Sequence, residues 1–218
     1  MAANVITLGR IILAFIILIM FQMGFYWRAA ALLLTILVIY LDSLDGIVAR
    51  KLGVASEFGA LFDITGDRIV EHLYWIFYTA MGLVSMWVPI IFISRSFLVD
   101  TLRGVAYAKE GKTPFGEKSM MRSPITRFLT ASRFSRAVYG AGKLIAFVLL
   151  GAILALQVAP QSLLNLLPAN FLPDLIYGTT VLVWVVVALN LIRGIPVLWD
   201  GRVYLFEKTL PRELKDAG

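Results

Sequence analysis

The sequence predicts an all-α integral membrane protein, a single domain in which six helices cross the bilayer. The first observation is composition: 60% of the 218 residues are hydrophobic and the mean hydropathy is +0.84, which is more apolar than a soluble domain requires. The second is that apolar runs of roughly 20 residues, the length that crosses a bilayer core as a helix, recur along the chain. The segments between these runs are too short for a soluble second domain, so we expect one membrane domain over residues 1–218.

The predicted helices follow one another in simple order. The first apolar run is not followed by a small-residue cleavage site, so we interpret it as a retained span and not as a signal peptide. Connections are expected at Trp27 and Arg28, in a glycine-rich segment after residue 49, at residues 82–87, in a polar stretch at 109–136, and at 159–174, which holds three prolines. The six predicted helices lie near residues 5–26, 29–49, 58–82, 86–108, 137–158 and 175–198.

Basic residues predict the orientation. Of the 20 Lys and Arg residues, only Arg28 lies in the connections after the first, third and fifth helices. The positive-inside bias therefore predicts that both termini and the segment 41–68 lie on the cytoplasmic side. The net charge of +6 is then explained by contact with anionic headgroups of the lipid bilayer and not by nucleic acid, for which no binding module is recognisable. The absence of cysteine excludes disulfides and thiolate metal sites.

The segment 41–68 holds the strongest candidate for a site. It contains four carboxylates, Asp42, Asp45, Asp63 and Asp67, in an otherwise apolar chain. In helices, the first two are three residues apart and the last two are four apart, so each pair shares a helix face. Two such faces brought together form an oxygen-lined pocket for a hard divalent cation. Any one of these residues alone would be read as the solvated flank of a membrane helix, but carboxylates at a membrane rim are costly and favour a site function.

The same segment resembles the signature of the CDP-alcohol phosphatidyltransferase family, D-x2-D-G-x2-A-R-x8-G-x3-D-x3-D. Members of this family transfer the phosphatidyl group of a CDP-linked lipid, usually CDP-diacylglycerol, to the hydroxyl of an alcohol and release CMP. The resemblance covers the whole chain loosely and residues 4–112 well. All of the fixed positions are filled here, by Asp42, Asp45, Gly46, Ala49, Arg50, Gly59, Asp63 and Asp67.

The resemblance implies roles for these residues. Asp42, Asp45 and Asp63 would hold two Mg²⁺ or Mn²⁺ ions, while Asp67 would also reach the metal and act as the general base on the acceptor hydroxyl. It further implies a homodimer in a cytoplasmic membrane of prokaryotic type. Space for the nucleotide and a ligand for its phosphate would come from Gly46, Ala49, Arg50 and Gly59.

The N-terminal segment NVITLGRI resembles the polar opening before the first span in the branch of the family that transfers to glycerol phosphate. This implies that Asn4 and Thr7, with Arg10, contact the nucleotide. The alternative is that these residues form a helix N-cap and an interfacial anchor.

The identity of the acceptor depends on the second half of the chain. Parts of it resemble phosphatidylglycerophosphate synthases, and Arg103, Lys143 and Arg193 fall near the cytoplasmic ends of three predicted helices. Together they would suit an acceptor that already carries phosphate, with glycerol 3-phosphate as the favoured one. The alternative is ordinary positive-inside decoration.

Two departures leave the acceptor open. Arg68 stands where the glycerol-phosphate branch has a lysine, and about 20 additional residues near 115–135 form either an amphipathic surface segment or an acceptor-specific lid. A phosphatidylinositol-phosphate synthase, with an inositol phosphate acceptor, is therefore an alternative. An alternative of another class is a cation transporter with intramembrane aspartates.

One further prediction concerns two charges outside the signature. By helix rise, Glu71 and Arg95 lie at a similar depth in neighbouring predicted helices. We therefore expect them to form an ion pair, since an unpaired charge at that depth is costly.

Overall fold

The computed structural model describes residues 2–52, 57–111, 121 and 123–205. Side chains are described in these ranges except at 2, 3, 39–52, 57, 58, 60, 110, 124, 131, 133 and 205. The described residues contain helices and no strand, which confirms the predicted all-α class. The helices are α1 (Ala2–Met20), α2 (Phe25–Leu52), α3 (Glu57–Ala80), α4 (Trp87–Glu110), α5 (Pro124–Ala131), α6 (Arg133–Leu156), α7 (Gln161–Leu164) and α8 (Phe171–Leu205).

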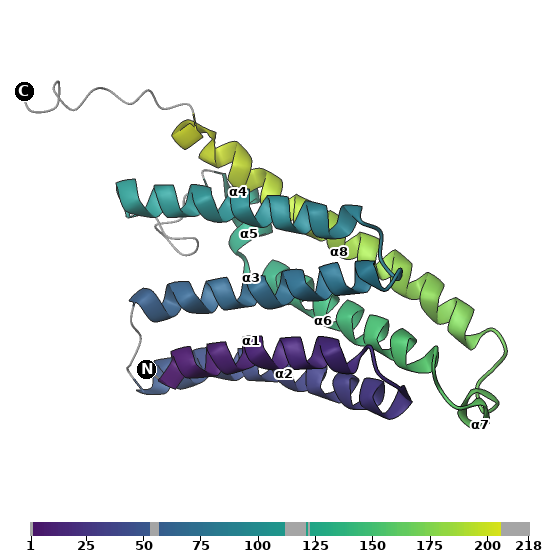
Figure 1. Ribbon diagram of the computed structural model, residues 1–218. Helices are drawn as coiled ribbons and strands as arrows, with labels where there is room; N and C mark the ends of the chain where they lie inside the picture. The colour runs from purple at the N-terminus through teal and green to yellow at the C-terminus, as the bar shows by residue number, and fades with distance from the viewer. Residues whose placement is uncertain (1, 53–56, 112–120, 122, 206–218) are drawn as a thin grey trace, which may run out of the picture. The chain divides into compact units, whose positions relative to one another are not determined.

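The chain divides into two compact units, which are described separately. Unit 1 consists of Met1–Ile93 with Tyr139–Ala188, and unit 2 of Ser94–Val138 with Leu189–Gly218. In unit 1, α1 packs against both α2 and α3, and the three helices run alongside one another (Figure 1). Unit 1 therefore holds the helices that carry the aspartates of the signature.

Aromatic side chains form the core of unit 1. Trp75 on α3 is fully buried, with its ring centroid 4.7 Å from that of Phe147 on α6 and 4.9 Å from that of Phe92 on α4. The hydroxyl of Tyr78 donates a hydrogen bond of 2.9 Å to the backbone carbonyl of Phe147, and that of Tyr74 lies 3.0 Å from Thr35 Oγ1 on α2. Large aromatic surfaces with satisfied hydroxyls fix the orientation of α3 about its own axis.

Two glycines allow helices of unit 1 to approach closely. A Cβ atom at Gly151 on α6 would lie 2.9 Å from Phe21 Cζ, and one at Gly66 on α3 would lie 2.5 Å from Thr7 Cγ2 on α1. Both distances are shorter than a carbon contact permits, so neither position accepts a larger residue without movement of its neighbour. Small residues at such crossings are typical of helices packed in membranes.

The first connection differs from the prediction. The chain turns at residues 21–24, where Gln22 N–H bonds to the Ile19 carbonyl at 3.0 Å, so the expected break at Trp27 and Arg28 is wrong. Both residues lie in the first turn of α2. The apolar run of the sequence continues through the turn, where Phe21 is fully buried. Hydropathy therefore does not reveal where the helix ends.

The polar stretch at 109–136 contains a short helix that is not among the six predicted spans and lies within the segment expected to be amphipathic or a lid. Helix α5 starts after Ser123, whose side chain accepts from Ile125 N–H, while the Thr126 hydroxyl accepts from the Ser123 N–H to complete a capping box. Helix α6 starts at Arg133 and not at 137, and α8 runs to Leu205, past Pro196 and past the expected end at 198.

Two stretches of the described chain, 125–156 and 171–204, are long and apolar enough to cross a membrane, and 4–20 and 25–38 form shorter apolar helices. Length and composition therefore agree with membrane association.

Unit 2 has a small apolar core. Val99 and Ala106 on α4 pack with Met121 and with Val197 on α8. At Gly194 on α8, an added Cβ would lie 2.8 Å from Arg95 Cγ, so the Arg95 side chain crosses the helix at the residue that leaves room for it. Asp200 accepts a hydrogen bond of 2.9 Å from the Thr126 hydroxyl and so joins α5 to α8.

Candidate active site

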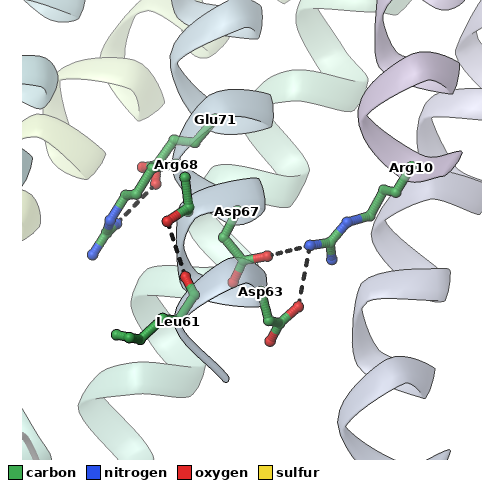
Figure 2. A network of polar contacts seen from close by, with 7 residues as sticks. Arg10, Leu61, Asp63, Asp67, Arg68 and Glu71 are labelled. Atoms are coloured by element: carbon green, nitrogen blue, oxygen red, sulfur yellow. Dashed lines mark hydrogen bonds and ion pairs between the residues drawn. The ribbon is translucent and has the colours of Figure 1, made fainter. Parts of the chain in front are cut away.

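Asp63 and Asp67 lie one turn apart on the same face of α3. Their Oδ1 atoms are 3.4 and 2.6 Å from one atom, Nη2 of Arg10 on α1. The two carboxylate side chains are 43% and 45% exposed, whereas that of Arg10 is 2% exposed. Figure 2 shows the guanidinium reaching both carboxylates from α1. The second aspartate pair thus presents oxygen atoms on one helix face, as its spacing predicts.

Arg10 contacts the motif aspartates because α1 comes close to α3. Thr7, one turn before Arg10, is buried against Gly66, which lies between the two aspartates in the sequence. For Arg10, the sequence predicts either nucleotide contact or an interfacial anchor. It does not predict the bond to Asp67. The three-residue spacing of Thr7 and Arg10 indicates a shared helix face, but it does not identify the helix that this face meets.

A second charged cluster lies one turn further along α3. The buried Glu71 accepts from Lys143 Nζ on α6 at 3.0 Å and from Arg68 Nη1 at 3.2 Å. The Tyr139 hydroxyl donates to the same carboxylate at 3.3 Å, and Lys143 Nζ lies 4.6 Å from the centroid of the Tyr139 ring. The charge of Glu71 is therefore compensated within unit 1. Arg95 belongs to unit 2, and its pairing with Glu71 stays a prediction.

The other two candidate acceptor ligands belong to unit 2. Arg103 Nη1 lies 4.0 Å from Asp100 Oδ1 on the same helix. The buried Arg193 donates from Nη1 to the Leu129 carbonyl at 3.3 Å and to Ser135 Oγ, and from Nη2 to the Thr130 carbonyl at 3.1 Å. These bonds join α8 to the end of α5 and the start of α6. The predicted convergence of Arg103, Lys143 and Arg193 on one anion stays a prediction.

Part of the signature lies outside the described side chains. Helix α2 extends to Leu52, so residues 42–50 are helical, and Gly59 lies in the first turns of α3. Within the residues whose side chains are described, no group of three or more acidic or histidine side chains surrounds a possible metal position. The half-exposed oxygens of Asp63 and Asp67 nevertheless match the ligands that Mg²⁺ and Mn²⁺ take. The predicted roles of five residues fall on positions outside the described side chains, namely Asp42, Asp45, Gly46, Ala49 and Arg50.

Comparison with known proteins finds named relatives that match part of this chain. A CDP-diacylglycerol–glycerol-3-phosphate 3-phosphatidyltransferase of Bacillus subtilis is 32% identical over 113 residues, 46% of this chain and 58% of the relative. A protein of Arabidopsis thaliana named CDP-diacylglycerol–glycerol-3-phosphate 3-phosphatidyltransferase 2 is 31% identical over 120 residues, 50% of this chain and 52% of that protein. The chain spans about half the length of these relatives.

A shorter match joins the chain to a protein with another acceptor in its name. The phosphatidylinositol phosphate synthase of Cutibacterium acnes is 44% identical over 62 residues, 28% of each chain. The sequence model of the CDP-alcohol phosphatidyltransferase family matches residues 1–192. This match begins just before α1 and extends through most of α8. It therefore includes Arg10, both described aspartates and Lys143. The chain therefore belongs to the CDP-alcohol phosphatidyltransferase family.

Proposed function

We propose that this protein transfers the phosphatidyl group of CDP-diacylglycerol to the hydroxyl of glycerol 3-phosphate, releasing CMP, in phospholipid biosynthesis. The observation that carries the proposal is the face of α3 on which Asp63 and Asp67 expose their carboxylates one turn apart. Family membership supports the reaction type. The names of the relatives in Bacillus subtilis and Arabidopsis thaliana support the lipid donor and the acceptor.

The residues of the chain would act on both substrates. As the oxygen of the acceptor hydroxyl attacks the phosphorus, the Asp67 carboxylate takes the hydroxyl proton, and the bond from phosphorus to the CMP oxygen breaks. Asp63, with Asp42 and Asp45 from α2, would hold Mg²⁺ or Mn²⁺, two ions in all, and Asp67 would also reach the metal. When bound, these ions neutralise the pyrophosphate and stabilise the charge on the leaving CMP.

The nucleotide side of the site would be formed by small and polar residues. Gly46, Ala49 and Gly59 leave space for the nucleotide, and Arg50 supplies a planar fork for phosphate. On α1, Asn4 and Thr7 are the proposed polar contacts, with Thr7 next to α3 at Gly66.

The acceptor side would be cationic. Lys143 is held beside the motif helix by Glu71 at 3.0 Å, which suits a ligand for the phosphate of the acceptor. Arg103 and Arg193 are proposed as further ligands. The name of the Cutibacterium acnes relative supports a second candidate, an inositol phosphate acceptor.

The proposal includes a placement in the membrane. Six spans with both termini and the site on the cytoplasmic side agree with the distribution of basic residues. A homodimer is proposed from family resemblance.

The decisive experiment measures CMP released by the purified protein with CDP-diacylglycerol, Mg²⁺ and a panel of acceptors. Release that requires glycerol 3-phosphate supports the proposal, and release that requires inositol phosphate supports the second candidate. No CMP with any acceptor would reject both. Divalent-cation flux into liposomes without CMP release would instead favour a transporter.

A further inference from the structure

Arg10 forms ion pairs with both half-exposed carboxylates on α3 and approaches them from the protein interior. One nitrogen, Nη2, lies 2.6 Å from Asp67 Oδ1 and 3.4 Å from Asp63 Oδ1 (Figure 2). The Arg10 side chain is 2% exposed and the two carboxylates are 43% and 45% exposed. A guanidinium therefore contacts the aspartate pair from the protein interior, while a little under half of each carboxylate side chain is exposed.

The Arg10 guanidinium lies at the crossing of α1 and α3. Gly66 and Thr7 meet at the crossing of α1 and α3, and a Cβ at Gly66 would lie 3.6 Å from Arg10 Nη2. A guanidinium buried in this way needs nearby negative charge, because a buried cation without a partner is costly. The carboxylates of Asp63 and Asp67 supply that charge. The stability of the crossing of α1 and α3 therefore depends on whether their negative charge is available to Arg10.

The contribution of Arg10 is charge and not spacing. The separation of Asp63 and Asp67 follows from their four-residue offset on one helix and does not require Arg10. Without a counter-charge, however, two like charges at this offset repel each other. A divalent ion that binds the same carboxylates would relieve this repulsion and would in turn be repelled by the guanidinium. The guanidinium and the ion thus oppose each other at one pair of side chains.

We propose that Arg10 is a built-in counter-cation of the acidic site, which holds Asp63 and Asp67 in the metal-free protein and thereby lowers their affinity for the divalent ion. The proposal rests on the proposed function in taking these two residues as metal ligands. Arg10 acts through them and is a positioning residue. By linkage, loss of Arg10 should destabilise the metal-free protein and tighten metal binding.

The test compares the full-length wild type with Arg10→Gln in detergent. Thermal unfolding is followed in EDTA and in saturating Mn²⁺, and Mn²⁺ binding is measured by electron paramagnetic resonance. In EDTA, we expect Arg10→Gln to unfold about 5 °C below the wild type, and most of this deficit should disappear in Mn²⁺. The variant should bind Mn²⁺ about tenfold more tightly, because a unit positive charge next to the site has gone.

Arg28→Gln is the matched control. Arg28 also lies in unit 1 and is partly buried, but its guanidinium donates to the carbonyls of Met23 at 2.9 Å and Leu154 at 2.7 Å and not to the acidic site. Its loss should lower the unfolding temperature equally in EDTA and in Mn²⁺ and leave the Mn²⁺ affinity unchanged. Arg10→Lys, which keeps the charge, should bind Mn²⁺ much as the wild type does.

Several results would overturn the proposal. They are Mn²⁺ affinity that is unchanged or weaker in Arg10→Gln, a thermal deficit of equal size with and without Mn²⁺, and no Mn²⁺ binding by any variant. If Arg10→Gln does not fold, Arg10→Gln combined with Asp67→Asn removes both charges and should fold. Failure of this double variant would also overturn the proposal, because it would show that Arg10 is needed for something other than this pairing.

The Mn²⁺ measurements do not require turnover. A wild type that shows the expected Mn²⁺ linkage but releases no CMP with any acceptor would reject the proposed function and leave the role of Arg10 standing. If the wild type releases CMP but Arg10→Gln shows no Mn²⁺ linkage, the role of Arg10 is rejected and the proposed function stands.

Discussion

At the scale of single residues, the acidic face of α3 separates into two environments within two helical turns. Asp63 and Asp67 are half exposed and share Arg10, whereas Glu71, one turn later, is buried between Lys143 and Arg68. The exposed pair suits reversible contact with metal and substrate, and the buried residue suits a permanent structural contact. The same helix can therefore carry chemistry at one level and fix its own position at the next.

The first prediction separates the roles of two aspartates. Asp67→Asn should lower turnover by at least about 100-fold, because the general base is lost, while CDP-diacylglycerol binding stays nearly unchanged. Asp63→Asn should instead weaken the metal-dependent binding of the nucleotide. Turnover and equilibrium binding of CDP-diacylglycerol are measured on both variants. An equal loss of nucleotide affinity in the two variants would remove the distinct role of Asp67.

The second prediction concerns Glu71. Glu71→Gln leaves the cations of Lys143 and Arg68 without their carboxylate, which should cost about 3 kcal/mol of stability by analogy with other buried pairs. Tyr139→Phe, which removes one hydrogen-bond donor at 3.3 Å, should cost about 1 kcal/mol. Unfolding in denaturant measures both, and Glu71→Gln with Lys143→Met should cost clearly less than the sum of the single changes. Additive costs would argue against this pairing.

At the scale of elements, the crossing of α1 and α3 decides which side chains meet at the candidate site. Arg10 is 53 residues from Asp63 and 57 from Asp67 in the sequence, and Gly66 lets α1 and α3 come into contact. Helix α5, with its capping box, lies within a polar stretch, and α8 continues past Pro196. In this chain, therefore, neither a polar stretch nor a proline by itself marks the end of a helix. A helix that has begun with a good cap continues as long as packing supports it.

The third prediction tests this crossing. Gly66→Val places a branched side chain where even a Cβ would lie 2.5 Å from Thr7 Cγ2, so we expect a loss of about 2 kcal/mol or more from overpacking. Gly9→Val is the matched control, because a Cβ at this exposed position of α1 meets nothing within 4 Å. Unfolding temperatures of both variants are compared with the wild type. A similar loss in the two variants would mean that overpacking at the crossing is not its cause.

At the scale of the whole molecule, the chain is an all-helical member of a family of phosphatidyltransferases, built from two compact units. The exposed surface of the described helices is rich in large apolar side chains, such as Phe15, Leu33 and Val185. Surfaces of this kind are expected where lipid replaces water as the solvent.

The fourth prediction concerns orientation. The chain has no cysteine, so a single introduced cysteine reports its own location without background. In sealed inverted vesicles, Lys109→Cys should react with a membrane-impermeant maleimide, and Gln161→Cys should react only after the membrane is opened. Both side chains are exposed. The opposite pattern would reverse the orientation given by the positive-inside bias.

The sequence by itself determined the helical class, the apolar character, the family signature and the shared face of Asp63 and Asp67. These follow from local properties: hydropathy reports burial in lipid, and a four-residue offset on a helix places two side chains together whatever surrounds them. Only the tertiary structure decided that Arg10 reaches these aspartates, that Lys143 binds Glu71, and that the first turn lies at 21–24. Each of these depends on which helix faces which and at what height, and this is set by packing between residues far apart in the chain. A charge pattern along one helix identifies a face that needs a partner, but the side chain that provides the partner is fixed only when the helices come together.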